Sequence, residues 1–235
     1  FLTAMAHELR TPLNSILGFN RRLIVKLGSE LDEQNYKTLV GVQRSAHHLL
    51  SLISDILEVS ELDAGKVQLK FDWESVNMLL DDVSSQMVGQ IADAGLSFDV
   101  TPLKDDVRVF ADRQKIIQVL LHLLVNAVQA TKEGSILLKA EHTQLAEHSA
   151  VCFSVTDTGV GLSRDEQHRI YRQFSQVDEH SGIEKGMGLG LYLIREITSL
   201  HGGAVFFEST LGMGSSFSVL IPVSANLSKL DAEVV

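Results

Sequence analysis

The sequence has a single cysteine, Cys152, among 235 residues. One thiol cannot form a disulfide within the chain, and it cannot build a zinc site from several cysteines. Cys152 stands in an apolar run that is typical of a buried strand. The composition therefore favours a reducing, intracellular setting, and we expect a cytoplasmic location.

Positive charge and long apolar runs are also scarce. Lys and Arg total 20 against 30 Asp and Glu, so the formal net charge is -10. Nucleic acids and anionic membranes bind clustered Lys and Arg, and we expect neither partner. No apolar stretch is long enough to cross a bilayer, and no signal-peptide pattern opens the chain. Because a helical pattern is already running at Phe1, we expect a fragment of a longer protein, with no membrane contact of its own.

The first 65 residues predict a hairpin of two helices. In residues 2–27 apolar side chains recur at alternating spacings of four and three, and Asn20 is the one polar break in this seam. A second, wider apolar stripe runs through residues 39–57. Two helices cannot bury both stripes against each other, so we expect a homodimer in which two hairpins form a four-helix bundle. Gly65 suits the end of the second helix.

Past residue 65 the pattern changes to short strands alternating with helices. It predicts strands at 66–73, 96–100, 107–112, 134–142, 150–157, 203–210 and 215–222. It predicts helices at 75–92, 113–131 and 189–200. We therefore predict an α+β chain with three parts: the hairpin, residues 1–65; an α/β sandwich with helices on one face of a mixed sheet, residues 66–225; and a C-terminal tail, residues 226–235.

A proline stands inside the first predicted helix, five positions after a histidine, in the sequence HELRTP of residues 7–12. A solvated surface histidine is the simpler interpretation of His7. However, Pro12 removes a helical hydrogen bond at a cost of about 3 kcal/mol. A costly bend beside an exposed imidazole favours a working site, in which Glu8 polarises or deprotonates the ring and Thr11 holds a water over it.

A line of polar residues runs along the otherwise apolar helix predicted at 113–131. The line consists of Lys115, Gln118, His122, Asn126 and Gln129, which recur at steps of three and four residues. A solvated helix edge explains this pattern as well as a binding site does. If the strip faces a ligand, amide oxygens together with phosphate and water are what Mg²⁺ prefers.

Two glycine-rich stretches are candidates for a nucleotide site. DTGVGLS, residues 157–163, follows a predicted strand, and its glycines let the backbone approach a planar ligand while the Asp carboxylate accepts a hydrogen bond from an amine. KGMGLGL, residues 185–191, opens a helix whose free N–H groups suit phosphate. Neither stretch has the setting of a Rossmann site, and no P-loop is present.

Taken together and in this order, the motifs resemble those of the sensor histidine kinases of two-component signalling, over nearly the whole chain. HELRTPL is similar to the H box and LLHLLVNAVQAT to the N box. DTGVGL and KGMGLGL are similar to the two glycine boxes, YRQFSQVD to the F box between them, and GMGSSF to the small motif that closes the ATPase domain.

The resemblance implies a role for each matching residue, with ATP and Mg²⁺ as cofactors. His7 would be the phosphoacceptor, Glu8 its general base, and Thr11 the residue that orients water in phosphatase activity. Asp157 would read the adenine amine, and Asn126 would coordinate Mg²⁺. The full set of nucleotide-binding candidates is Asn126, Gln129, Asp157, Gly159, Gly161, Phe174, Lys185, Gly186, Gly188, Leu189, Gly190 and Ser215.

Three positions depart from the family pattern. His122 stands where the N box has its first Asn; it is the second candidate metal ligand, although imidazole suits Mg²⁺ less well than an amide oxygen does. Gln129 stands where many members have a lysine. Lys185 begins the second glycine box in place of a glycine, and it either restores the lost positive charge or is a solvated residue.

The resemblance implies a kinase core that autophosphorylates His7 with ATP, passes the phosphoryl group to an aspartate of a response-regulator receiver domain, and also acts as a phosphatase on that regulator. It further implies that the chain is the cytoplasmic part of a larger sensor. Two alternatives stay open. One is a related ATPase of the gyrase, chaperone or mismatch-repair kind, in which the H box would have no purpose. The other is a catalytically silent dimeric scaffold, which His122 and Gln129 favour.

Overall fold

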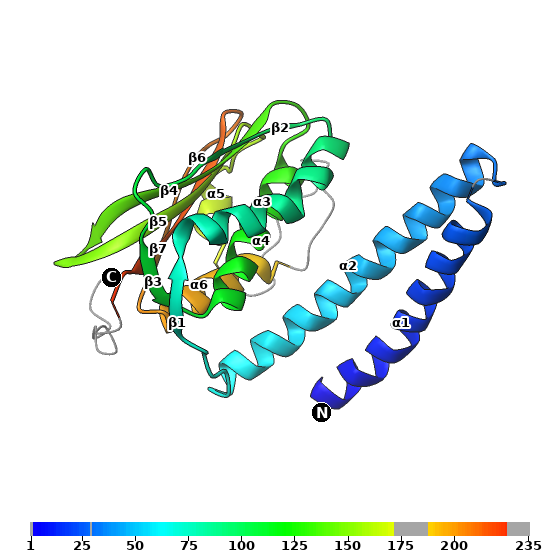
Figure 1. Cartoon of the computed structure of the whole chain (residues 1–235), viewed down its shortest axis with the longest axis horizontal. Coiled ribbons are helices and arrows are strands. Elements are labelled where there is room, and N and C mark those ends of the chain that lie inside the picture. Colours follow the sequence, from blue (N-terminus) through cyan, green and yellow to red (C-terminus); the bar gives the residue numbers. More distant parts are fainter. Residues whose placement is uncertain (1, 29, 172–187, 225–235) are drawn as a thin grey trace. The chain divides into compact units, whose positions relative to one another are not determined.

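The computed structural model describes residues 2–28, 30–171 and 188–224, and Figure 1 shows its helices and strands in chain order. The chain divides into two compact units, Phe1–Val67 and Gln68–Val235. The predicted tail, residues 226–235, lies outside the described residues. In the described part of the chain, no helix combines the length and the apolar character that crossing a bilayer requires.

The first unit is a hairpin of two long helices, α1 (Leu2–Leu27) and α2 (Glu33–Asp63). Asp32 caps α2, because its side chain accepts a hydrogen bond of 2.8 Å from the N–H of Asn35. The second helix ends where predicted, since Gly65 follows it with a φ of 63°. The two predicted helices are thus confirmed.

Within one chain, the hairpin buries only part of its apolar seam. The buried residues are Ala6, Leu13, Ala46 and Ile53, with Leu17, Leu50 and Leu57 packed against them. By contrast, Leu9, Ile16 and Leu23 of the same predicted seam are 51%, 48% and 43% exposed. The first helix therefore has one apolar face against α2 and a second apolar face in solvent.

Asn20, the polar break in the seam, is buried between the two helices. Its side chain is only 4% exposed, and its amide donates a hydrogen bond of 2.8 Å to the carbonyl oxygen of Leu39 on α2. A buried amide with one well-placed acceptor favours a single alignment of the helices, since a shifted alignment loses the bond. Asn20 thus sets the register of the hairpin.

The second unit is built on a mixed five-stranded sheet with the order β2-β4-β5-β7-β6. Strand β2 runs parallel to β4, and the other neighbours are antiparallel. The strands are β2 (Ser97–Thr101), β4 (Ser135–Leu145), β5 (His148–Asp157), β6 (Ala204–Thr210) and β7 (Gly214–Pro222). A separate two-stranded sheet pairs β1 (Asp72–Ser75) with β3 (Arg108–Ala111).

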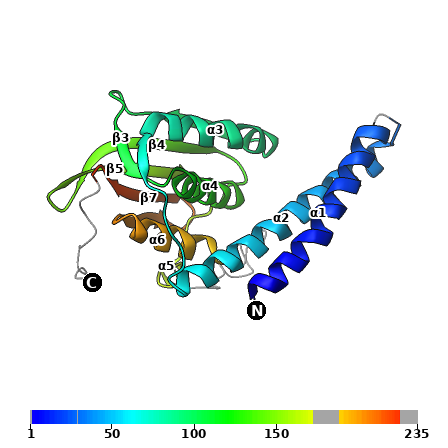
Figure 2. The same ribbon diagram turned by 60° about the horizontal axis from the view of Figure 1, so that its bottom comes forward.

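Three helices cover one face of the five-stranded sheet, as Figures 1 and 2 show. They are α3 (Val76–Asp93), α4 (Arg113–Ala130) and α6 (Gly190–Leu200). Alternate residues of β4 (Ile136, Leu138 and Ala140) are buried, as expected for a strand with one face on a core. The predicted α/β sandwich with helices on one face is confirmed.

The predicted strand at 66–73 is mostly wrong. Only residues from Asp72 onward pair, because the partner β3 is four residues long and offers no further ladder. Before that point the N–H of Lys70 donates to the Asp112 carboxylate at 2.8 Å instead of to a strand. A short helix, α5 (Arg164–Gln167), was not predicted, since four residues are too few for a periodic pattern.

His201, directly after α6, links that helix to the start of α4 by a hydrogen bond. Its Nε2 accepts a hydrogen bond of 3.1 Å from the N–H of Asp112, and its Nδ1 lies 2.8 Å from the carbonyl oxygen of Ile197. The ring is therefore neutral, with its proton on Nδ1. Burial is the main cause that lowers the pKa of His201 below its ordinary value of 6.5.

This arrangement predicts an acid-sensitive fold. Protonation would place a second N–H on Nε2 against the N–H of Asp112. Since the pKa of His201 is lowered in the folded chain, its contribution to stability is present above about pH 6.5 and is lost as the pH falls. In His201→Gln the amide oxygen can accept the same hydrogen bond without titrating. Thermal unfolding between pH 7.5 and 5 should show a smaller loss of Tm in His201→Gln than in the unchanged chain; equal slopes would contradict this role of His201.

Candidate functional site

Strand β5 ends at Asp157, the residue predicted to accept a hydrogen bond from the amine of adenine. Strand pairing places Asp157 opposite Ser215 on β7, and Ser215 opposite Ser209 on β6. Paired residues point to the same face of a sheet, and Asp157 also pairs with the buried Ile136 of β4, so all four residues lie on the face that the helices cover. The hydroxyls of Ser209 and Ser215 are 2.9 Å apart. The sheet thus brings two predicted site residues, Asp157 and Ser215, side by side.

The Asp157 carboxyl group is buried, with 4% of the residue exposed. Burial raises its pKa above the ordinary value, because water no longer solvates the charged form. Hydrogen bonds from the backbone N–H groups of Gly159, at 2.8 Å, and of Ser215 lower the pKa and oppose this effect. A buried carboxylate held by two backbone donors is a fixed acceptor for an amine of a ligand.

The glycine turn after Asp157 packs directly against the end of helix α4. The N–H of Val160 donates to the carbonyl oxygen of Ala130 at 3.1 Å. A Cβ atom at Gly159 would lie 2.3 Å from the same oxygen, closer than any side chain permits. The predicted N box and first glycine box therefore share one backbone junction.

The other side of the same turn packs against the β6–β7 hairpin. The carbonyl oxygen of Val160 accepts a hydrogen bond of 2.7 Å from Gly212. Gly161 has a φ of 65°, and a Cβ there would lie 2.1 Å from the carbonyl oxygen of Thr210. Only glycine fits this position. The closing motif that contains Ser215 is thereby joined to the first glycine box.

The polar strip on α4 is half-buried along its whole length. His122 and Asn126 are one turn apart, so their side chains lie on the same face of the helix. Among the described residues, no group of three or more His, Cys, Asp or Glu side chains could hold a metal ion. A Mg²⁺ ion held by Asn126 and His122 would need oxygens of phosphate and water as its remaining ligands, which is how proteins commonly hold this ion.

The second glycine box is partly described. Gly188 has a φ of 69°, and α6 begins at Gly190 after Leu189, whose side chain makes no capping hydrogen bond. Among the residues that the structure describes, none has an atom within 4 Å of a Cβ placed at Gly190. Leu189 is 2% exposed and anchors this turn in the core. The other three predicted residues of this region, Phe174, Lys185 and Gly186, lie outside the described residues.

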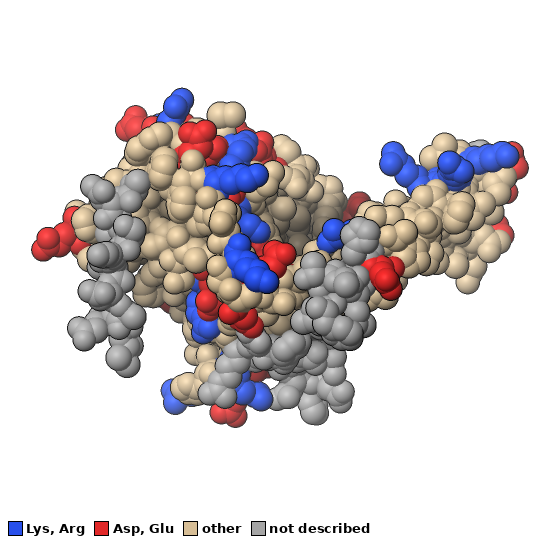
Figure 3. Space-filling model, turned by 90° about the horizontal axis from the view of Figure 1, so that it is seen from below, with Lys and Arg blue, Asp and Glu red and all other residues tan. Residues whose placement is uncertain are grey.

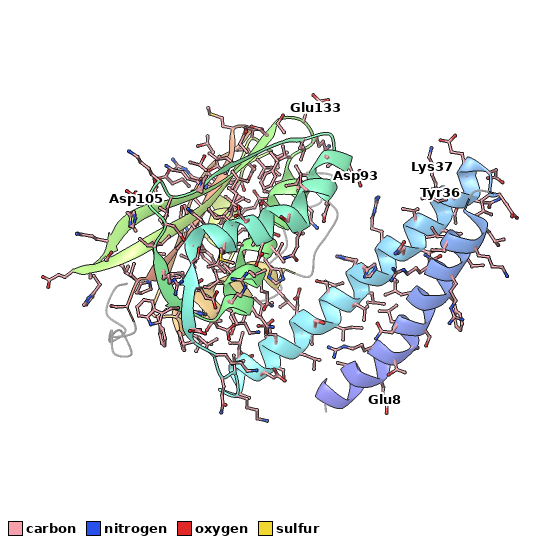
Figure 4. All side chains as sticks on the ribbon, viewed as in Figure 1. Glu8, Tyr36, Lys37, Asp93, Asp105 and Glu133 are labelled. Atoms are coloured by element: carbon pink, nitrogen blue, oxygen red, sulfur yellow. The ribbon has the colours of Figure 1, made fainter. Side chains whose placement is uncertain are left out.

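The predicted catalytic residues belong to the other unit. His7, Glu8 and Thr11 all lie within α1, and Glu8 and Thr11 are exposed. Figure 4 shows the Glu8 side chain pointing away from α2. Pro12 lies inside the same helix, which continues past it.

Charged side chains are distributed differently over the two units. Figure 3 shows Lys, Arg, Asp and Glu interspersed over the visible face of the second unit, and Lys and Arg gathered at the loop end of the hairpin. The exposed basic residues of that end include Arg21, Arg22, Lys26 and Lys37.

Ser209 is a further candidate site residue, and the sequence alone did not indicate it. Its hydroxyl contacts Ser215 and accepts a hydrogen bond of 2.8 Å from the N–H of Leu162, which follows the glycine turn. A single serine in a strand carries no sequence signal, and only the pairing of β6 with β7 places it beside the turn.

Comparison with protein families identifies both units. Residues 111–225 match the family model of the histidine kinase-, DNA gyrase B- and HSP90-like ATPases, so the second unit carries an ATPase domain of this class. Residues 1–65 match the model of the His kinase A phosphoacceptor domain. The chain combines the two and belongs to the sensor histidine kinases, as the catalytic core of such a protein.

Individual relatives agree with this family. The chain is 36% identical over 229 residues to the circadian input-output histidine kinase CikA of Synechococcus elongatus. The aligned region covers 94% of this chain and 29% of the relative. It is 36% identical over 243 residues to the non-motile and phage-resistance protein of Caulobacter vibrioides, covering 100% of the chain and 28% of the relative. The chain thus spans less than a third of the length of either curated relative.

A solved structure is similar over both units. The crystal structure of full-length ShkA in complex with AMPPNP matches with a TM-score of 0.73 and 31% identity, over 95% of this chain and 46% of that chain.

The close contacts at Gly161 predict a large cost for a single methyl group. Both Gly161 and Gly95 have positive φ values, of 65° and 73°, but a Cβ at Gly95 would meet nothing within 4 Å. Gly95→Ala should therefore cost only the conformational strain, about 1 kcal/mol. Gly161→Ala adds a clash with backbone and should cost at least about 2 kcal/mol more. Urea unfolding of the two variants measures the difference, and equal losses would contradict the clash.

Proposed function

We propose that this chain is an ATP-dependent protein-histidine kinase that phosphorylates His7. The observation that carries the proposal is the combination, in one chain, of an exposed phosphoacceptor helix with an ATPase unit. The match to the phosphoacceptor model over residues 1–65 argues against a gyrase-type or chaperone-type ATPase, which would not need this hairpin.

The nucleotide-binding role rests on the geometry around Asp157. We propose that the buried carboxylate accepts a hydrogen bond from the exocyclic amine of adenine, while Gly159 and Gly161 allow the backbone to lie close to the base. The start of α6, from Gly188 to Gly190, would bind phosphate through its N–H groups. Similarity to a protein that was crystallised with AMPPNP supports ATP as the ligand.

The chemistry follows from the residues of α1. An imidazole nitrogen of His7 attacks the γ-phosphorus of ATP, an N–P bond forms, and the bond to the leaving ADP oxygen breaks. Glu8, on the adjacent position, accepts the proton that the ring loses. Mg²⁺, held by Asn126 and its neighbour His122, would neutralise the charge that develops on the phosphate oxygens. Thr11, one turn after His7, would orient water when the chain acts as a phosphatase.

The partners are proposals as well. Leu9, Ile16 and Leu23 leave an apolar face of α1 in solvent, and Val42 and Leu49 of α2 are likewise 41% and 47% exposed. A second copy would cover these faces in a four-helix bundle, which makes the chain a homodimer. The phosphoryl group would pass from His7 to an aspartate of a response-regulator receiver domain.

The domain assignment follows from the same proposal. Residues 1–65 would serve dimerisation and phosphotransfer, residues 66–225 would bind ATP, and residues 226–235 would form a tail. The chain would work in the cytoplasm as part of a longer sensor.

One competing function rests on two residues of α4. His122 and Gln129 replace an amide and a positive charge that the family pattern has near the phosphates. If their effect is large, the chain binds nucleotide without turnover and acts as a dimeric scaffold.

Labelling with ATP separates these two functions. The chain is incubated with γ-labelled ATP and Mg²⁺ beside a His7→Ala variant, and the label is scored for lability in acid and stability in base. We expect label on the unchanged chain and none on His7→Ala, because a phosphoramidate on histidine has this stability pattern. Nucleotide binding without any label would instead support the scaffold.

The variant Asp157→Asn, in which an NH₂ group replaces one carboxylate oxygen, tests adenine recognition. In Asp157→Asn the remaining oxygen can still accept from the N–H of Gly159, but the new NH₂ group cannot accept from Ser215 or from the adenine amine, against which it stands as donor against donor. ATP binding should weaken at least about tenfold, which corresponds to about 1.4 kcal/mol. Asp99→Asn, at an exposed position of β2, is the matched control and should bind ATP normally. Calorimetric titration measures both, and unchanged affinity of Asp157→Asn would remove Asp157 from the site.

A further inference from the structure

The short helix α5 is fixed at its start by its own side chains. The hydroxyl of Ser163 accepts a hydrogen bond from the N–H of Glu166 at 3.4 Å, and the Glu166 carboxylate accepts one from the N–H of Ser163 at 2.7 Å. This reciprocal capping box holds the first turn of a helix that is only four residues long. The last residue of α5, Gln167, thereby has a fixed position next to the glycine turn.

Gln167 joins two parts of the nucleotide site with one side chain. Its Nε2 donates to the carbonyl oxygen of Leu162 at 3.0 Å and to the carbonyl oxygen of Ser209 at 3.1 Å. Leu162 directly follows Gly161 of the glycine turn, and Ser209 belongs to strand β6. Both hydrogens of the amide are therefore used, and the side chain is half-buried.

The remaining anchors of the turn are of two kinds. Near α4 and the β6–β7 hairpin, the anchors of Val160 are backbone to backbone, so no side-chain substitution removes them. At the far end, Leu162 is held by side chains, its N–H by the hydroxyl of Ser209 and its carbonyl by Gln167. The position of this end of the turn thus depends on residue identity.

We propose that Gln167 is a positioning residue for the nucleotide, because its amide fixes the end of the turn that begins at Asp157. The inference rests on the proposed role of Asp157 in binding adenine. Gln167 itself touches no substrate; it acts by holding Leu162 against Ser209, and this limits how far Asp157 and Gly161 move before the base is bound.

The test compares three variants of the full chain by titration with ATP. Gln167→Leu keeps the approximate volume and loses both hydrogen bonds, so the Kd for ATP should rise fivefold to tenfold. Gln167→Glu places a carboxylate against two carbonyl oxygens at pH 8, and its Kd should rise further. Gln90→Glu, at an exposed position of α3, introduces the same charge away from the site and should bind ATP as the unchanged chain does.

The pH profile of Gln167→Glu distinguishes positioning from a general loss of structure. Half-burial and two facing carbonyl oxygens disfavour the charged form, so we expect the pKa of the new carboxyl group to lie above its ordinary value of about 4.3. As the pH falls from 8 to 5 the carboxyl group gains a proton and can donate one hydrogen bond again, so its Kd should fall toward that of the unchanged chain at the same pH. The titratable residues nearest along α5 and β6 are Asp165, Glu166, His168 and Glu208. They are present in every variant, so comparing each variant with the unchanged chain at the same pH removes their own titration from the difference. Thermal unfolding at each pH identifies any variant that is not folded.

Two outcomes contradict the proposal. If folded Gln167→Leu binds ATP with unchanged Kd, Gln167 does not position the site. If the Kd of folded Gln167→Glu rises but stays equally raised down to pH 5, the loss comes from disturbed packing and not from the hydrogen bonds. Failure of the proposed function looks different, since then the unchanged chain itself would not bind ATP. Should a variant be unfolded, Ser209→Ala removes the acceptor for the Leu162 N–H and must raise the Kd in the same way.

Discussion

The proposed nucleotide-binding end of the second unit depends on backbone segments that approach each other more closely than side chains allow. A Cβ at Gly159 would collide with the end of α4, and one at Gly161 with the end of β6. At Gly214, where β7 begins, it would lie 2.0 Å from the carbonyl oxygen of Asp157. Three glycines from two distant motifs thus let a helix, a strand end and a hairpin meet around one buried carboxylate. Because the backbone itself forms this junction, the place of Asp157 is set by close packing.

The hairpin is constrained in a different way, because one apolar face of α1 is buried against α2 and another is exposed. Ala6 and Leu13 pack within the chain, whereas Leu9 and Ile16, on the neighbouring face, are exposed. One copy is therefore an incomplete core, and a second copy would complete it. Asn20 binds α2 through a single hydrogen bond, which fixes how the two helices align and hence where His7 lies along the hairpin.

Asp112 links the second unit internally. Its carboxylate caps α4 through the N–H of Lys115 and also receives the N–H of Lys70, while its own N–H is bound by His201. One residue thus ties the chain entering the ATPase unit to the start of α4 and the end of α6. Helix α4 carries the metal candidates and α6 the phosphate candidates. The bond between Asp112 and His201 joins the start of α4 to the end of α6, so it holds each helix at the end opposite to its candidate residues.

Much of this protein could be predicted from local patterns. The helical periods, the glycine at position 65 and the order of the motifs are properties of neighbouring residues, and they indicated the hairpin, the sandwich and the family. The strand at 66–73 was mostly wrong because pairing length depends on the partner strand. Ser209, Gln167 and His201 carried no signal, since their hydrogen bonds join residues 42 to 89 positions apart or depend on strand register. The sequence by itself determined which elements form and which chemistry they bear; the tertiary structure alone decided which side chains meet around Asp157, because contacts between distant residues exist only once the sheet has assembled.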